Sequence, residues 1–299
     1  MNNYTIGLII KSIGGLYLAE SPLGVIECKA KGIFRKKNIS PYVGDNVRIE
    51  QIVKNTGIIS EIYNRKNSII RPPLANLDYI IFVISTCEPS PNYLLIDKFM
   101  AIAEYKNIKS IIAVTKRDLL INDEIKRIYL NSGADIFEID YECGDTYNAL
   151  YNKLAGNISA FTGNTGAGKS TLLNMMDKRL HLQTGEISKK LGRGRHTTRH
   201  VELYKLNNGG YIADTPGFST FDTQKYDIIL KNRLELCFNE FEEYLGKCKF
   251  QGCSHTKEKG CAVLEAVKNG YIHKSRHNSY VTMYDEAKLI KEWEVKDRF

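Results

Sequence analysis

The chain has 299 residues, of which 43% are hydrophobic, so it can build the cores of two or three domains. Lysine and arginine outnumber aspartate and glutamate by 42 to 34, and the resulting charge of +8 is common in proteins that bind nucleic acid. No apolar run approaches the roughly 18 residues that a membrane span requires. The first residues also lack the cationic and then apolar pattern of a signal peptide, so we expect a cytoplasmic protein with no membrane contact.

Short apolar stretches alternate with turns throughout residues 1–67, which predicts an OB-like β-barrel. Residues 7–10 and 16–19 are strand-like, and turns are expected at 14–15 and 43–46. Ten lysines and arginines against five aspartates and glutamates give this segment a net charge of +5. The basic residues cluster at Lys29, Lys31, Arg35, Lys36 and Lys37. OB-folds commonly bind oligonucleotides, so we expect RNA contact here, and the alternative is a solvated basic face that binds nothing.

A predicted strand at 109–114 ends in a guanine-recognition motif of the type [NT]-K-x-D. The motif consists of Thr115, Lys116, Arg117 and Asp118. Its aspartate accepts hydrogen bonds from the guanine N1–H and N2–H₂ groups. The motif is short and weak by itself, but it lies at the carboxyl end of a strand, where doubly wound α/β sheets bind ligands. In ordinary GTPases this motif closes the domain, whereas here it precedes the phosphate-binding segment.

That segment is a complete G-x-x-x-x-G-K-S phosphate loop between a predicted strand at 157–162 and a helix that begins near Ser170. Its glycines let backbone N–H groups converge on phosphates, and Lys169 adds a cation at the positive end of the helix dipole. About fifty residues later, 214–217 reads Asp-Thr-Pro-Gly and follows a strand-like run at 210–213. This D-x-x-G motif would place Asp214 near Mg²⁺, although Asp-Thr-Pro-Gly is also good turn chemistry.

The order of these motifs predicts a circularly permuted P-loop GTPase domain. We expect an OB-fold barrel at 1–67, the GTPase domain at 68–222 and a mostly helical zinc-binding domain at 223–299. The expected GTP-binding residues are Thr115, Lys116, Arg117, Asp118, Gly163, Asn164, Thr165, Gly166, Ala167, Gly168, Lys169, Ser170, Thr171, Asp214 and Gly217. Lys169 also serves catalysis, because its cation stabilises charge on the phosphates.

The carboxyl-terminal domain contains three cysteines and a histidine in the pattern C-x-x-x-x-C-x-H-x-x-x-x-x-C. The expected ligands of one structural Zn²⁺ are Cys248, Cys253, His255 and Cys261. Three thiolates and an imidazole close a tetrahedral site, and the alternative is a run of reduced thiols beside a stray histidine. Beyond it, we expect a helix from about 280 to 299 with Met283, Ala287, Ile290 and Trp293 on its packing face. Residues 271–277 either contact phosphate or form a solvated surface.

Together the barrel, the permuted motifs and the cysteine pattern resemble the RsgA family, also called YjeQ or EngC. The likeness covers essentially the whole chain, including 42–45, 71–78, 192–199 and 261–263. It implies slow GTP hydrolysis that the small ribosomal subunit stimulates during late maturation, with rRNA as partner, Mg²⁺ bound with GTP, and a monomer. The alternatives are a permuted GTPase of the large subunit and a non-enzymatic RNA-binding assembly protein. Where GTPases often support the base with Ser-Ala, 138–141 reads Glu-Ile-Asp-Tyr, so that contact stays unassigned.

The residues do not decide which group orients the attacking water. Many GTPases place glutamine directly after D-x-x-G, but this chain has Phe218, which cannot hydrogen-bond, so intrinsic turnover should be slow. His196 lies in the segment similar to switch I and is the candidate to position water. The equal alternative is that it belongs to a basic RNA-facing loop with Arg193, Arg195, Arg199 and His200. In the same segment Thr198, or its neighbour Thr197, would join Ser170 and Asp214 at magnesium.

Overall fold

The computed structural model describes residues 4–141, 144–180, 201–214 and 228–290, and the chain divides into two compact units. Unit 1 comprises Met1–Tyr79, Tyr151–Thr162 and Lys169–Pro216. Unit 2 comprises Ile80–Leu150, Gly163–Gly168 and Gly217–Phe299. Among the described residues, no helix combines the length and the apolarity that crossing a bilayer requires.

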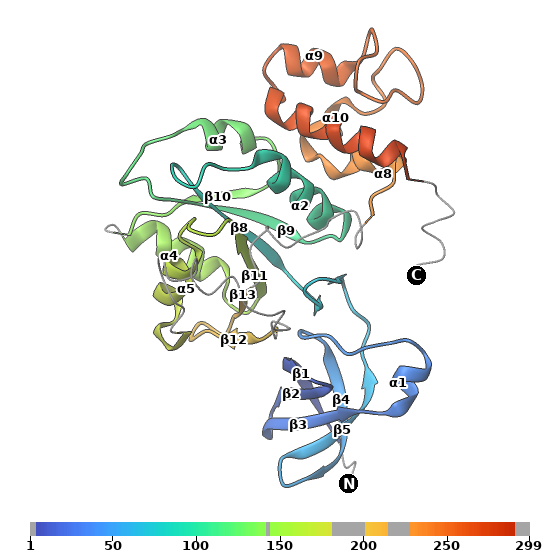
Figure 1. Cartoon of the computed structure of the whole chain (residues 1–299), viewed down its shortest axis with the longest axis vertical. Helices are drawn as coiled ribbons and strands as arrows, with labels where there is room; N and C mark the ends of the chain where they lie inside the picture. Colours follow the sequence, from blue (N-terminus) through green and yellow to red (C-terminus); the bar gives the residue numbers. More distant parts are fainter. Residues whose placement is uncertain (1–3, 142–143, 181–200, 215–227, 291–299) are drawn as a thin grey trace, which may run out of the picture. The chain divides into compact units, whose positions relative to one another are not determined.

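The first five strands form the predicted barrel (Figure 1). They are β1 (Tyr4–Ile13), β2 (Leu16–Ser21), β3 (Gly24–Ala30), β4 (Asn46–Val53) and β5 (Thr56–Ile62), with helix α1 (Gly32–Lys36) between β3 and β4. The barrel closes in the order β1-β2-β3-β5-β4, and only the β3–β5 pair is parallel. Every second side chain along such a strand points inward, which buries Ile9, Ile26, Ile49 and Ile59 in its core. The OB-like architecture is therefore confirmed.

The barrel is joined to the next segment by a partly buried ion pair and a close backbone contact. Asp45 is fully buried, pairs with Arg65 at 2.7 Å and accepts a hydrogen bond from the Tyr42 backbone N–H at 2.7 Å. Gly44 has φ of +93°, and a Cβ there would lie 2.2 Å from the Ala75 carbonyl oxygen. Two of the segments that carry the family resemblance, 42–45 and 71–78, therefore meet at this junction.

Six strands form the second sheet, in the order β10-β9-β8-β11-β13-β12. The strands are β8 (Tyr79–Ser85), β9 (Lys109–Thr115), β10 (Asp135–Glu138), β11 (Ile158–Gly163), β12 (Leu203–Lys205) and β13 (Tyr211–Asp214). The helices between them are α2 (Tyr93–Tyr105), α3 (Glu124–Tyr129), α4 (Gly144–Lys153) and α5 (Lys169–Met176), followed by the 3-10 turn η1 (Lys178–Leu180). Strand β8 has the sequence YIIFVIS and is buried along its whole length, as expected for a strand covered on both faces. The short hairpin of β6 (Ser68–Ile69) and β7 (Leu74–Ala75) precedes it.

Within unit 1 the barrel contacts the edge of this sheet through charged side chains. Lys11 of β1 pairs with Glu202 at 2.7 Å, just before β12. Glu20 of β2 pairs with Lys205 and accepts a hydrogen bond from the Tyr211 hydroxyl at 2.9 Å. The barrel is therefore held against the chain that leads into Asp214.

The carboxyl-terminal module, residues 228–290, consists of short helical elements. These are α8 (Lys231–Leu234), η3 (Glu235–Cys237), η4 (Asn239–Tyr244), α9 (Ala262–Lys268) and α10 (Lys274–Lys288). Its hydrophobic core includes Phe238, Phe241 and Tyr280, together with Ala101 and Ile102 from α2. The module thus shares one core with the helix that follows β8.

The position predicted for the last helix is wrong. Helix α10 begins at Lys274, where the His273 side chain accepts the Ser275 backbone N–H, and it ends at Lys288. Met283 and Ala287 are buried as predicted, but Ile290 follows the helix. Trp293 lies outside the described residues. The helix therefore begins at the His273 cap, several residues before the first apolar residue of the repeat, Met283.

Arg276 and His277 also differ from the expectation, because both are buried and neither can contact phosphate. Arg276 donates to Asp97 of α2 at 2.6 Å and to Glu240 of η4 at 2.6 Å. Burial acts to lower the pKa of Arg276, but the Glu240 and Asp97 carboxylates outweigh that effect and raise it, so the guanidinium stays charged. This buried pair of ionic contacts connects the carboxyl-terminal module to α2.

Arg276→Ala should lower the free energy of unfolding by about 3–5 kcal/mol, because it leaves two carboxylates buried without their cation. Lys288→Ala is the control, since Lys288 pairs with Asp285 at 3.1 Å on the surface and its loss should cost about 0.5 kcal/mol or less. Guanidinium titrations followed by circular dichroism measure both. Equal stability of the two variants would contradict the assigned role of Arg276.

Candidate nucleotide site and metal centre

The phosphate loop connects the carboxyl end of β11 to the start of α5. Gly163 ends the strand, and a Cβ at this position would lie 2.5 Å from the Val83 carbonyl oxygen of β8, so only glycine fits. Gly168 has φ of +91°, a left-handed conformation that favours glycine. Helix α5 then begins at Lys169, as the motif predicts, with Ser170 and Thr171 in its first turn. Strand, loop and helix therefore have the arrangement that binds phosphates at a helix N-terminus.

Thr115 joins the guanine motif to this loop. Its buried hydroxyl donates to the Ala167 carbonyl oxygen at 2.6 Å, although the two residues are 52 positions apart in the chain. On the other side, the Thr86 backbone N–H donates to the Thr115 carbonyl oxygen at 3.0 Å. The first residue of the motif therefore holds two separate segments together.

The next two residues of the motif hold its backbone in place. Lys116 has φ of +61°, its carbonyl oxygen accepts the Thr86 hydroxyl at 2.8 Å, and its ammonium donates to the Glu88 carbonyl oxygen. Arg117 pairs with Glu138 at 2.6 Å. The structure thus gives Arg117 a contact with β10, and the side chain of Asp118, the next residue, is exposed.

Asp214, the first residue of the D-x-x-G motif, is the last residue of strand β13. Strand β13 runs parallel to β11, and Asp214 is in register with Phe161, two residues before the phosphate loop begins. Both strands therefore end at the same edge of the sheet. Of the other predicted site residues, His196, Thr198 and Gly217 lie outside the described residues.

The four predicted metal ligands come together in unit 2. Their ligand atoms all lie within 4.8 Å of one another. The Sγ atoms of Cys248 and Cys261 are 3.8 Å apart, and His255 Nδ1 lies 3.6 Å and 3.4 Å from them. Tetrahedral zinc, with bonds of about 2.3 Å to sulfur and 2.0 Å to nitrogen, separates its ligand atoms by roughly 3.5–3.8 Å. The cluster therefore fits a zinc ion of the Cys₃His type.

A further shell of contacts fixes these ligands. Glu235 of η3 lies 3.0 Å from His255 Nε2, which orients the ring so that Nδ1 faces the three sulfurs. The His255 carbonyl oxygen lies 2.7 Å from His277 Nε2, and the Tyr280 hydroxyl donates to the Ser254 carbonyl oxygen at 3.0 Å. Helix α10 thus supports the loop that carries the second and third ligands.

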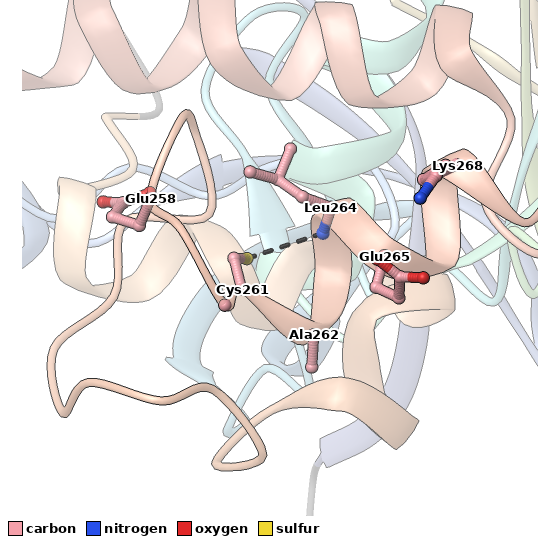
Figure 2. Close-up of a pocket in the computed structure, with 7 residues that line it drawn as sticks. Glu258, Cys261, Ala262, Leu264, Glu265 and Lys268 are labelled. Carbon is pink, nitrogen blue, oxygen red and sulfur yellow. Dashed lines mark hydrogen bonds between the residues drawn. The ribbon is translucent and has the colours of Figure 1, made fainter.

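Backbone N–H groups point at two of the sulfurs, a common arrangement for metal-bound thiolates. Figure 2 shows Cys261 at the start of α9, where its Sγ accepts the Leu264 backbone N–H at 3.5 Å. The Ala262 N–H donates to Cys248 Sγ at 3.3 Å. Burial is the main cause that raises the pKa of Cys253, to about 12, so a cation is needed to keep this thiol ionised at neutral pH. The open hollow of about 400 Å³ beside Cys261 is lined by α9 and the preceding loop.

Sequence reasoning missed two residues that support the metal loop, because neither belongs to a recognisable motif. Glu235 is 20 positions before His255, and only the fold brings them together. Glu258 accepts the backbone N–H groups of Ser254, Thr256 and Lys257 at 2.8–3.0 Å. Burial alone would raise the pKa of Glu258, but hydrogen bonds from Ser254 and from the backbone lower it to about 2. The nearby cysteine pattern could have indicated that acidic residues support the loop, but not which ones.

The fold and the site define a circularly permuted GTPase with an amino-terminal barrel and a carboxyl-terminal cysteine-rich module. Residues 62–224 match the RsgA GTPase family model, and residues 6–59 match the model of the RsgA N-terminal domain. The crystal structure of YjeQ from Thermotoga maritima covers 96% of this chain and 100% of its own, with 31% identity and a TM-score of 0.80. The crystal structure of YloQ, a circularly permuted GTPase, covers 95% of this chain and 95% of its own, with 33% identity and a TM-score of 0.77.

Named relatives agree with these structures. The "Small ribosomal subunit biogenesis GTPase RsgA" of Clostridium beijerinckii is 44% identical over 283 residues, which is 94% of this chain and 96% of that protein. The protein of the same name from Ruminiclostridium cellulolyticum is 40% identical and covers 97% and 96% of the two chains. The chain therefore belongs to the RsgA family, and it is a GTP-hydrolysing enzyme.

Asp118→Asn should weaken GTP binding by about 3 kcal/mol, roughly two orders of magnitude in Kd, because the charged acceptor of two guanine N–H groups is lost. The variant should bind xanthine nucleotides better, since xanthine has a carbonyl in place of the amino donor. Calorimetric titrations with GTP, XTP and ATP measure the change. Asp285→Asn, an exposed aspartate of α10 outside the motif, is the control and should behave as wild type. An unchanged preference for GTP over ATP in Asp118→Asn would remove Asp118 from the base site.

Cys253→Ala should release zinc and unfold the carboxyl-terminal module, because the remaining three ligands leave the tetrahedral site open. The phosphate loop follows strand β11 of the six-stranded sheet and is no part of the carboxyl-terminal module, so it should still bind nucleotide. Elemental analysis and nucleotide titration test the two statements. Cys237→Ala is the matched control, since Cys237 is buried in the same module but lies outside the cluster, and it should keep its zinc. Wild-type protein without stoichiometric zinc would end this assignment.

Proposed function

We propose that this GTPase binds the small ribosomal subunit and its rRNA and assists late maturation of the subunit. The observation that carries the proposal is the set of relatives named for small-subunit biogenesis, which match at 40–44% identity over at least 94% of this chain. Likeness at this level extends over the barrel, the GTPase core and the cysteine-rich module together. The proposal therefore concerns the whole chain and not one domain of it.

The surface of the barrel supports an RNA partner. The basic cluster lies on β3, α1 and their flanks, and all five of its side chains are exposed: Lys29, Lys31, Arg35, Lys36 and Lys37. Phe34 is buried and anchors the short helix that carries two of them, Arg35 and Lys36. Exposed cations on a fixed element are suited to phosphate contacts, which are independent of base sequence. The small-subunit rRNA is the proposed ligand of this face.

The nucleotide site supports GTP as the switch. Residues 163–171 would hold the phosphates with Lys169 as the cation, residues 115–118 would hold the base, and the Gly217 amide would meet the γ-phosphate. The accompanying Mg²⁺ neutralises charge between the phosphates, and Ser170 and Thr198 would be its ligands, with Asp214 in the outer shell. Phe218 cannot orient water, so the basal rate is slow. We assign water positioning to His196, which acts once the subunit has docked.

The remaining parts of the proposal concern organisation. Residues 1–67 act as the RNA-binding barrel, 68–222 as the GTPase domain and 223–299 as the zinc domain, with Zn²⁺ in a structural role. Four protein ligands leave no coordination position for a substrate, which supports that role. The protein works as a monomer in the cytoplasm, where ribosomal subunits mature.

Phosphate release from GTP tests this function most directly. The purified protein is assayed under multiple turnover alone, with small subunits and with large subunits. Small subunits should raise the rate by about 10²-fold or more, as expected when a partner completes general-base catalysis. Equal or greater stimulation by large subunits would assign the enzyme to that subunit instead, and no stimulation by either would refute the proposed partner.

Two variants should separate binding from catalysis. Lys169→Ala removes the cation at the phosphates and should abolish both basal and stimulated hydrolysis. His196→Ala should leave nucleotide affinity unchanged, because a group that positions water contributes little to ground-state binding. Its loss should cost about 10²-fold of the stimulated rate and barely change the basal one. If His196→Ala sediments with the subunit and keeps full stimulation, His196 belongs only to the basic loop.

A further inference from the structure

Tyr141 lies at the point where other GTPases support the guanine base with a small residue. Strand β10 runs parallel to β9, and the Ile139 backbone N–H extends this ladder by donating to the Val114 carbonyl oxygen at 2.7 Å. Tyr141 therefore leaves the sheet beside the end of β9, where Thr115 begins the guanine motif. The sequence alone assigned no function to this position.

The Tyr141 hydroxyl lies beside Gly168, the last glycine of the phosphate loop. A Cβ built on Gly168 would lie 3.2 Å from the Tyr141 hydroxyl oxygen and 3.4 Å from the Thr115 hydroxyl oxygen. The absence of a side chain at Gly168 therefore makes room for both hydroxyls. Thr115 uses its hydroxyl to donate to Ala167. The Tyr141 hydroxyl and the first residue of the guanine motif, Thr115, therefore both lie close to Gly168 of the phosphate loop.

The Tyr141 hydroxyl is shielded from solvent and has no hydrogen-bond partner among the described residues. Such a group is rare in a folded protein and calls for a specific explanation. Burial first and the Asp118 carboxylate second raise the pKa of Tyr141 to about 12. The hydroxyl is therefore protonated at physiological pH and can donate a hydrogen bond. The Asp118 carboxylate is a nearby acceptor.

We propose that Tyr141 is a positioning residue for guanine recognition, whose hydroxyl donates to the Asp118 carboxylate when a guanine nucleotide is bound. The exposed carboxylate is hydrated in the free protein, and the edge of a bound guanine displaces that water. The guanine N1–H and N2–H₂ groups replace two of the lost hydrogen bonds, and Tyr141 supplies a third that fixes the carboxylate in the plane of the base. The inference rests on the proposed assignment of Asp118 to the base.

The test is Tyr141→Phe, which removes the hydroxyl and keeps the ring against Gly168. Calorimetry with full-length protein measures Kd for GDP and for IDP, whose base lacks the 2-amino group. The Kd for GDP should rise about tenfold, the usual effect of losing a hydrogen bond to a charged group. The Kd for IDP should rise less, because IDP makes only one of the two contacts with Asp118. The preference for GDP over IDP should therefore fall by roughly threefold or more. A parallel loss of both affinities, with that preference unchanged, means a merely structural role and overturns the proposal.

Two further variants complete the experiment. In an Asp118→Ala background, Tyr141→Phe should not change the Kd for GDP, because the partner of the hydroxyl is gone, and an undiminished effect overturns the proposal. Tyr129→Phe is the matched control, since its hydroxyl is also buried beside a carboxylate, that of Asp97, outside the guanine motif, and it should keep the wild-type preference. If Asp118→Ala itself leaves the preference for GDP over ATP intact, the base-site assignment fails together with this inference. If Asp118→Ala loses the preference for GDP over ATP, but Tyr141→Phe keeps the wild-type ratio of the Kd values for GDP and IDP, only the inference about Tyr141 fails.

Discussion

The guanidinium of Arg276 is the constraint on which the arrangement of unit 2 depends. A buried charge is tolerated only where opposite charges meet it, and here the carboxylates come from Asp97 and from Glu240, which lie 179 and 36 positions away in the chain. Phe238 closes the site, with the guanidinium 4.7 Å from its ring centroid. An apolar contact between helices could slide by a turn, but these two ion pairs are satisfied in one register only. The carboxyl-terminal module and α2 therefore pack in a single arrangement, which the shared hydrophobic core then stabilises.

This packing changes how the cysteine-rich module is understood. The motif order alone suggests a separate module reached through the segment after Asp214, whereas in the structure the module also rests on α2. Helix α2 follows residues 86–89, which hold Thr115 and Lys116 in place. Contacts thus run without a break from the guanine motif through α2 to Arg276, and from there through Tyr280 to the loop of the metal ligands. These contacts connect the guanine motif to the metal loop physically. Energetic coupling between the two sites additionally requires that nucleotide binding change one of these contacts.

Local patterns in the sequence predicted the parts of the fold that local chemistry determines. The barrel strands, the phosphate loop at the end of β11 and the four clustered metal ligands follow from turns, glycines and ligand spacing. Which side chains become buried by segments distant in the sequence was not predictable in this way. In the sequence, Arg276 has the features of a surface cation, but in the fold α2 and η4 enclose it. Glu235 and Tyr141 likewise lie next to residues that are distant in the chain, and only the fold brings them together. The start of α10 was missed because the His273 cap, and not the apolar repeat, determines where that helix begins.

Circular permutation explains why the two added modules lie where they do along the chain. The contacts that a GTPase needs between strand ends are present, as Thr115 with Ala167 and the pairing of Phe161 with Asp214 show. What differs is which segments continue into new domains. The barrel is held at Glu202 and Lys205, directly after residues 181–200, which contain the segment similar to switch I. The cysteine-rich module begins directly after residues 215–227, which follow Asp214. Each segment expected to respond to the γ-phosphate is therefore followed directly by residues that contact or belong to an added module. The exit after Asp-Thr-Pro-Gly into the cysteine-rich module is the connection that permutation creates, because in an ordinary GTPase the chain continues there into more of the GTPase core.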